Sequence, residues 1–201
     1  MSPRPRSAAP RLARALAVGL VAFAALGEER ATAAPQLTST LMVGVAGRGD
    51  RSDLWSSTDF AGGLRGELLF GRARDADFGF GPHAEVLTTA GFSDVQIGGG
   101  ATLLVPVHPY LPLTLSAGGY AAHGDGIGWR PGLSTELFWG SHGYNYGSLY
   151  ALSAGLFAGL RYDLDPSREV TFLLGGRVDL ELLALPFLLV WNAFRGGDPA
   201  R

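Results

Sequence analysis

Apolar residues alternate with small or polar residues, with a period of two, through most of the chain after residue 33. In the clearest run, 111–122, Leu111, Leu113 and Leu115 fall on one face and mostly small or hydroxyl-bearing residues fall on the other. Side chains of an extended strand point alternately to its two sides, so this period predicts β-strands with one apolar face. We expect eight such strands, at residues 37–47, 64–70, 78–86, 95–105, 111–122, 133–139, 152–162 and 174–182.

The segments between these runs are rich in Gly, Asp, Ser, Asn and Pro, as turns between antiparallel strands are. None of them holds a helical pattern of about 10 to 15 residues that would serve as a crossover, so we expect each strand to pair with its neighbours in sequence. One stretch departs from the pattern, because Leu182 to Trp191 is apolar on both faces and contains Pro186. It is compatible with a short apolar cap, a helix or a kinked strand extension. The expected connections are 48–59, 71–77, 88–94, 106–110, 123–129, 140–147 and 163–169.

The period alone does not say whether the apolar face of a barrel points inward or outward, but three other features favour an apolar exterior. The second face is rich in Gly, Ala, Ser and Thr, which suits a narrow barrel interior. Only 17% of the residues are charged, compared with about 25% in soluble domains. Aromatic residues gather toward the strand ends, where the two water interfaces of a bilayer would lie. We therefore predict an all-β fold, an eight-stranded antiparallel up-and-down transmembrane β-barrel. The aromatic residues in question are Phe60, Phe70, Phe92, Tyr110, Trp129, Trp139, Tyr150 and Tyr162.

The first 33 residues have the order of a secretory signal peptide. Four Arg residues precede the apolar stretch Ala15 to Leu26, and Ala31-Thr32-Ala33 offers small residues for cleavage after Ala33. The apolar stretch would rise about 18 Å as a helix, short of a bilayer core about 30 Å thick. The expected organisation is a signal peptide at 1–33, a barrel domain at 34–194 and a polar tail at 195–201, with the mature protein in the cell outer membrane.

At the level of strand count, alternation and size, the whole mature chain resembles the small outer-membrane barrels of the OmpA/OmpX type. No diagnostic motif accompanies the resemblance. Barrels of this class have outer loops longer than their periplasmic turns, whereas here only 48–59 stands out as long. Such barrels also end on a Phe in the last strand, and Phe194 is a loose match to that position.

Several charged residues fall on the face assigned to the barrel interior. One interpretation is a polar pore lining or an acid/base site. The other is a structural plug, because an eight-stranded barrel is too narrow for an open channel and buried charges are usually paired. We favour the plug. The residues of this interior polar network are Arg65, Glu67, His83, Glu85, Glu136, Arg161, Arg177, Asp179 and Glu181.

Other residues are candidates for chemistry or recognition. His142 with Ser141, Ser148 and Glu136 suggests a lipid acyl hydrolase at one rim, but no His begins the His-x-Ser pattern of deacylase barrels. The tripeptide Arg48-Gly49-Asp50 spells a cell-attachment motif in an expected loop, although three residues recur by chance. The chain has no Cys, and its His residues lack paired ligand spacing, so we expect no catalytic residue, metal or cofactor. The four His residues are His83, His108, His123 and His142.

Charge narrows the range of partners. After residue 33 the chain carries 11 Arg against 16 acidic residues, without a basic stripe, so nucleic acid is not an expected partner. We expect a monomer in contact with outer-membrane lipid, with a non-enzymatic structural, adhesive or surface-binding role exerted through its loops. The alternatives are a narrow channel for small solutes, a rim-sited lipid acyl hydrolase and a soluble periplasmic lipocalin-like carrier.

Overall fold

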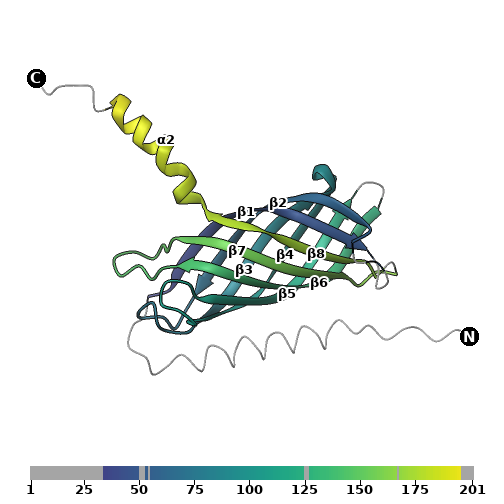
Figure 1. Cartoon of the computed structure of the whole chain (residues 1–201), viewed down its shortest axis with the longest axis horizontal. Helices are drawn as coiled ribbons and strands as arrows, with labels where there is room; N and C mark the ends of the chain where they lie inside the picture. Colours follow the sequence, from purple (N-terminus) through teal and green to yellow (C-terminus); the bar gives the residue numbers. More distant parts are fainter. Residues whose placement is uncertain (1–33, 50–52, 54, 125–126, 167, 196–201) are drawn as a thin grey trace, which may run out of the picture. The chain divides into compact units, whose positions relative to one another are not determined.

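The computed structural model describes residues 34–49, 53, 55–124, 127–166 and 168–195. The expected signal peptide and most of the expected polar tail lie outside these ranges. Eight antiparallel strands close into one barrel in chain order, which confirms the predicted fold class (Figure 1). The strands are β1 (Gln36–Gly49), β2 (Ser57–Leu69), β3 (Gly79–Thr89), β4 (Asp94–Val105), β5 (Leu113–Gly124), β6 (Ile127–His142), β7 (Ser153–Asp163) and β8 (Val170–Asp179).

The barrel closes where β8 pairs with β1, with Val43 opposite Gly176. Closure leaves no unpaired strand edge, which is the condition for a sheet to cross a lipid bilayer. Because the number of strands is even, β1 begins and β8 ends at the same end of the barrel, here called the terminal end. The connections 70–78, 106–112 and 143–152 lie at this end, whereas β1 and β2, β3 and β4, β5 and β6, and β7 and β8 are joined at the opposite end.

The two longest connections, 70–78 and 143–152, are therefore at the terminal end. The expectation that 48–59 is the longest connection is wrong. β1 continues to Gly49 and β2 begins at Ser57, so pairing between these strands takes up both ends of the expected loop. A short 3₁₀ turn, η1 (Ala90–Phe92), connects β3 to β4 and has positive φ angles at all three of its residues.

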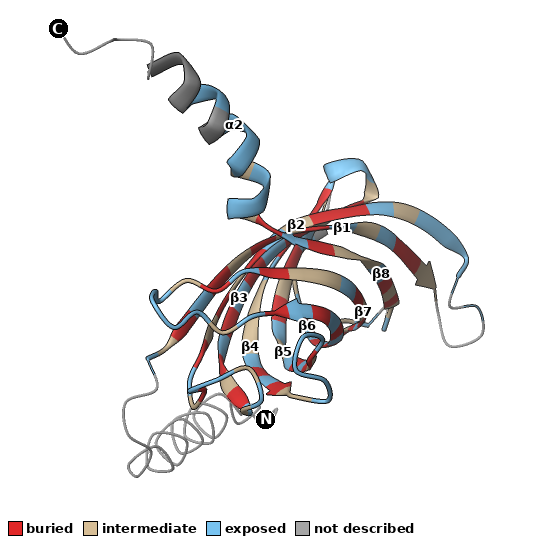
Figure 2. Ribbon diagram, turned by 60° about the vertical axis from the view of Figure 1, so that its left-hand side comes forward, coloured by how far each residue is buried: buried red, intermediate tan, exposed pale blue. Residues whose placement is uncertain are grey.

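The polar face of each strand points into the barrel and the apolar face points outward. In β3, His83 and Glu85 are buried whereas Ala84 and Val86 are exposed, and the same alternation follows the other strands in Figure 2. Leu156 on β7 is 64% exposed although it lies within a strand. The apolar exterior is therefore confirmed, and the inward apolar face that a lipocalin-like carrier requires is not the arrangement found.

The aromatic residues expected at strand ends divide evenly between the two ends of the barrel. Phe60, Phe92, Trp129 and Tyr162 lie at the opposite end, and the rings of Phe60 and Phe92 are 6.0 Å apart. Phe70, Tyr110, Trp139 and Tyr150 lie at the terminal end. Two aromatic rims separated by an apolar band are the arrangement that transmembrane barrels present to the two bilayer interfaces.

The interior also contains an apolar cluster, made of Met42, Ala46, Ala61, Leu87, Phe138, Phe157 and Leu173. The interior is also closely packed around Gly132. A Cβ atom built on Gly132 would lie 2.2 Å from Cζ of Tyr120, so the tyrosine ring occupies the space above this glycine. Glycine is required at residue 132 to make room for the ring inside the narrow barrel.

The barrel ends at Asp179, and the helix α2 (Leu180–Arg195) follows, where the expected domain boundary extends the barrel through residue 194. The backbone N–H of Glu181 donates to Oδ1 of Asp179 at 2.8 Å, which is an N-cap interaction. Leu and Ala, which are strong helix formers, fill most of the following turns. Among the described residues, no helix is both long and apolar enough to cross a membrane.

Candidate functional site

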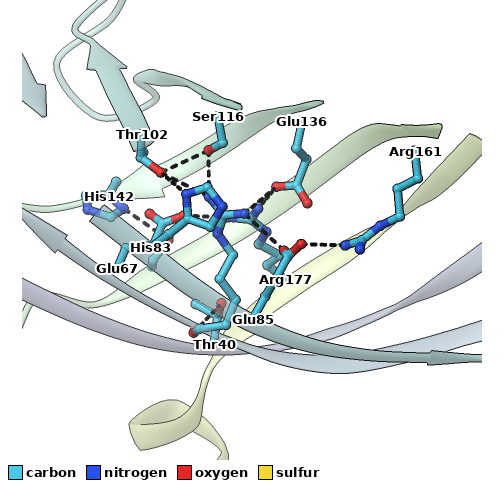
Figure 3. Close-up of polar contacts among 12 residues, drawn as sticks. Thr40, Glu67, His83, Glu85, Thr102, Ser116, Glu136, His142, Arg161 and Arg177 are labelled. Atoms are coloured by element: carbon cyan, nitrogen blue, oxygen red, sulfur yellow. Dashed lines mark hydrogen bonds and ion pairs between the residues drawn. The ribbon is translucent and has the colours of Figure 1, made fainter. Parts of the chain in front are cut away.

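The residues expected in the interior network are largely brought together. Seven of them come from β2, β3, β6, β7 and β8, are buried, and form a central network across the lumen (Figure 3). Asp179 is buried at the end of β8 and caps α2, and Glu181 lies exposed on α2, outside the interior. The central network consists of Arg65, Glu67, His83, Glu85, Glu136, Arg161 and Arg177.

Arg65 is the hub of the central network. Its Nε lies 2.5 Å from Oε1 of Glu67 and its NH1 group lies 3.2 Å from Oε2 of Glu85. Its NH2 group donates across the lumen to the hydroxyl groups of Thr102, at 3.0 Å, and Ser116, at 2.5 Å. All of its guanidinium nitrogens therefore have partners inside the barrel, as buried charge requires.

The two other arginines close the network. Arg161 contacts Oε1 of Glu85 at 2.6 Å and Oε1 of Gln96 at 2.9 Å. Arg177 contacts Oε1 of Glu67 at 3.1 Å and also pairs with Glu136.

The Arg177 guanidinium also lies over two rings, 5.0 Å from the ring centre of Phe138 and 5.7 Å from that of Phe157. Three arginines thus face the carboxylates of Glu67, Glu85 and Glu136, so the central network balances its formal charges.

Little space remains beside this network. The cavity lined by Arg65, His83, Glu85, Glu136 and Arg161 has a volume of ≈ 10 Å³. That is about the volume a single water needs. His83 uses Nδ1 in a 3.0 Å hydrogen bond with the Thr102 hydroxyl, so it is part of the polar packing. The described side chains therefore fill the lumen at this level.

A second network lies at the opposite end, and sequence reasoning missed it. Arg48 contacts Asp94 at 2.8 Å, and Arg130 contacts both Asp94, at 3.3 Å, and Asp163, at 3.0 Å. Tyr120 donates a hydrogen bond to Asp163. Arg48, Asp94 and Asp163 lie at strand ends that the turn pattern assigned to loops, although their positions have the same two-residue parity as the central network. The two-residue alternation could therefore have assigned these side chains to the barrel interior.

The tripeptide Arg48-Gly49-Asp50, which spells a cell-attachment motif, begins inside a strand. Arg48 lies in β1, is bonded to Thr89 and Asp94, and is not displayed on a loop. Gly49 ends β1, and Asp50 lies outside the described residues. Glu169, from the 164–169 connection, approaches Nε of Arg48 at 3.8 Å, and partial burial raises the pKa of its carboxyl group.

The terminal end is closed by Arg72, a second feature that sequence reasoning missed. The 70–78 connection folds back so that the Arg72 side chain is fully buried, and its NH2 group donates to the carbonyl of His142 at 3.1 Å. Asp75 lies 3.9 Å away, and the ring of Tyr144 lies 5.8 Å from the guanidinium carbon. Burial lowers the pKa of Arg72 below its ordinary value.

The residues considered for a rim hydrolase do not come together as that alternative requires. His142 Nδ1 lies 3.3 Å from the hydroxyl of Ser153. The Ser141 hydroxyl instead donates to the backbone carbonyl of Ala154. The carbonyl of Ser148 accepts from the Gln36 side chain, and its hydroxyl accepts from the backbone N–H of Tyr150. His142 and Ser153 are both buried inside the barrel. Glu136, the proposed acid, pairs with arginines.

Within the described ranges, no group of His, Asp and Glu side chains is placed to hold a metal ion. His83 and His142 point into the interior from different strands, and His108 and His123 stack beside Tyr110 and Trp129.

Comparison with known proteins adds little beyond the barrel class. No protein family model matches the chain, and no curated protein is similar enough in sequence to match. Among solved structures, the Yersinia pestis outer membrane protein Ail, determined in a phospholipid bilayer nanodisc, is similar at 11% identity and a TM-score of 0.38. The similarity covers 71% of this chain and 99% of that chain. The closed eight-stranded barrel with an apolar exterior defines the class by itself: this chain resembles the small outer-membrane barrels at the level of class only.

Proposed function

We propose that this protein resides in the outer membrane as a barrel with a closed lumen, and that it has a non-enzymatic structural or surface-binding role exerted through its loops. The observation that carries the proposal is the central network of Arg65 and its partners, which fills the lumen with paired charges. A barrel built this way presents lipid with its outside and water with its two ends.

The exterior supports the location. Leu64, Ile97 and Leu174 are each about half exposed on three different strands, where a soluble protein would lose free energy by exposing them to water. The aromatic rims bound this apolar band at both ends. Such a surface has a lower free energy in contact with lipid than in contact with water.

The interior supports closure at three levels. Arg72 lies at the terminal end, the central network lies in the middle, and Arg48 with Arg130 lies at the opposite end. A conducting path would need charged groups that are open to water, whereas these guanidinium groups are bonded to carboxylates, hydroxyls or a backbone carbonyl. The narrow-channel alternative is therefore disfavoured by the same contacts that favour the closed barrel.

The connections support contact through the loops. Those at the terminal end are the longest and display Tyr110, 76% exposed, and Tyr146, 74% exposed, together with Val107 and Phe78. Exposed tyrosines on loops are suited to contacts with other molecules. Burial of His142 and Ser153 inside the barrel supports a role without catalysis, because a substrate would have to reach them through packed side chains.

The test of location is expression of the full chain in a Gram-negative host, membrane fractionation, and gel mobility with and without boiling. We expect recovery in the outer membrane and a folded band that shifts on heating. A soluble periplasmic product would overturn the proposal.

The test of closure is the conductance of planar bilayers that contain the folded barrel. We expect no steady conductance from the wild type or from Arg74→Ala, a control on an exposed arginine outside the lumen. Steady ion conductance of the wild type would replace the closed barrel with the channel alternative.

A further inference from the structure

We infer that α2 is a membrane-surface helix, which lies in the headgroup and acyl-chain boundary of the lipid leaflet at the terminal end of the barrel. This inference rests on the membrane location proposed above. It assigns a lipid-binding role to a segment that the barrel does not need for closure, because β8 pairs with β1 through Asp179 without it.

The surface of α2 is apolar and largely uncovered. Leu183, Leu185 and Val190 are 40%, 47% and 57% exposed, and Phe187 is 77% exposed. Figure 2 shows the described residues of α2 as almost uniformly exposed. An apolar helical surface of this kind loses free energy in water and needs an apolar partner.

The sequence spacing of the few polar residues of α2 predicts a single polar stripe. Only Glu181, Asn192 and Arg195 are polar among its 16 residues. In an ideal helix, which turns about 100° per residue, sequence positions 192 and 195 fall within about 20° and about 40° of position 181 around the axis. A helix that is apolar except for a narrow polar stripe can bury its apolar surface among acyl chains while the stripe faces the headgroups.

Length excludes a spanning arrangement. The 16 residues of α2 rise about 24 Å, which is shorter than a hydrocarbon core of about 30 Å. Pro186 also removes one backbone hydrogen-bond donor within the helix. A helix with these properties is stable along the boundary, where headgroups and water satisfy its polar groups.

The direct connection of α2 to the apolar outer surface of the barrel indicates that its partner is lipid. Leu174 and Val178 on β8 point outward into the apolar band, and α2 begins at Leu180 without a linker. Asp179 fixes this start by accepting the backbone N–H of Glu181. The helix therefore begins at the rim of the surface that contacts lipid, and Phe70 and Trp139 lie at this same rim.

The absence of cysteine makes a direct test available, because single substitutions can be labelled specifically. We would introduce Phe187→Cys on the apolar surface of α2 and Glu181→Cys on its polar stripe. Leu156→Cys on the outer face of β7 reports the barrel in lipid, and Tyr146→Cys in the 143–152 connection reports water. Each variant of the full chain is labelled with an environment-sensitive fluorophore. It is then folded into phosphatidylethanolamine/phosphatidylglycerol vesicles that contain shallow or deep lipid quenchers.

The expected result is several-fold stronger quenching at Phe187→Cys than at Glu181→Cys or Tyr146→Cys, with the shallow quencher more effective than the deep one. Water-like emission at Phe187→Cys, with Leu156→Cys quenched, would overturn the inference and leave the barrel proposal intact. Shifted emission at Phe187→Cys without quenching by lipid would also overturn it, in favour of a protein partner. Loss of quenching at Leu156→Cys as well would overturn the proposed membrane location itself.

Discussion

Arg65 and Glu67 lie two residues apart on β2, and inside the barrel the Nε of the arginine is 2.5 Å from Oε1 of the glutamate. The two-residue spacing places both side chains on the inner face of one strand. The same arginine reaches Glu85 on β3, Thr102 on β4 and Ser116 on β5, so one side chain links four strands through the lumen. The stability of the barrel should depend strongly on this residue.

Arg65→Ala should lower the free energy of unfolding by about 3 to 5 kcal/mol, because Glu67 and Glu85 would then be buried with fewer positive partners. Arg74→Ala is the matched control, since Arg74 is 72% exposed and pairs with Asp77 at the surface. The control should change stability by less than about 1 kcal/mol. Urea unfolding of both variants in lipid vesicles measures the difference. Equal effects of the two substitutions would show that the central network does not stabilise the barrel.

Gly132→Ala should lower the free energy of unfolding by about 1 to 3 kcal/mol, because the added methyl group would overlap the Tyr120 ring. Displacement of that ring would also disturb its hydrogen bond to Asp163. Gly128→Ala, on the same strand, is the control, because a Cβ there meets no atom within 4 Å. The same unfolding measurement distinguishes them, and an unchanged stability of Gly132→Ala would refute the packing argument.

Leu174→Arg should lower the free energy of unfolding in lipid by about 2 to 4 kcal/mol, the cost of an arginine near the bilayer midplane. Leu174 is about half exposed in the middle part of β8. Tyr146→Arg, in a connection outside the strands, should have almost no effect. If both substitutions were tolerated equally, the apolar band would not be in contact with lipid.

Asp179→Ala should weaken α2 by about 0.5 to 2 kcal/mol, because it removes the acceptor for the Glu181 N–H at the start of the helix. Asp179→Asn should restore most of the loss, since asparagine is an equally good N-cap residue. Amide hydrogen exchange in the first turns of α2 measures the change. Unaltered protection in the alanine variant would contradict the capping role.

The stability of the folded chain should fall between about pH 10 and about pH 12 through Tyr150. Burial raises the pKa of Tyr150 to about 12, and its hydrogen bond to Asp179 at 3.0 Å adds to the increase. The unfolded chain loses this phenolic proton near pH 10, so the folded state binds more protons in that interval and stability falls as pH rises. The contribution is fully present below about pH 10.

The measurement is unfolding free energy against pH for the wild type and for Tyr150→Phe. The phenylalanine variant should lose less stability than the wild type between about pH 10 and about pH 12. Parallel curves for the two proteins would indicate that Tyr150 titrates normally in the folded state.

The alternation of residue types was sufficient to predict the strands and their orientation. His83 and Glu85 were placed inside, and Ala84 and Val86 outside, because a period of two assigns side chains to faces without knowledge of their partners. Low charge and aromatic residues near strand ends then predicted which face meets lipid. The signal peptide remains a prediction, as does the absence of a catalytic site.

The same period did not settle the strand ends. Asp94 falls in the predicted turn 88–94, and Arg130 lies between the predicted turn 123–129 and the predicted strand 133–139, yet pairing with neighbouring strands extends β4 and β6 through these positions. For Asp179 and Glu181, the two-residue spacing placed both side chains in the lumen. A helix begins between them, because Asp179 caps the helix and the following residues favour it.

The sequence by itself therefore determined the class of fold and the two faces of the sheet, because these depend on local periodicity and on the free energy of placing apolar groups in lipid. Only the tertiary structure decided that Arg65 pairs with Glu67 and Glu85, that Arg72 folds back over the terminal end, and that Arg48 lies inside the opposite end. These contacts join residues from different strands and loops. Their geometry depends on strand register and barrel closure, which no local pattern in the sequence encodes.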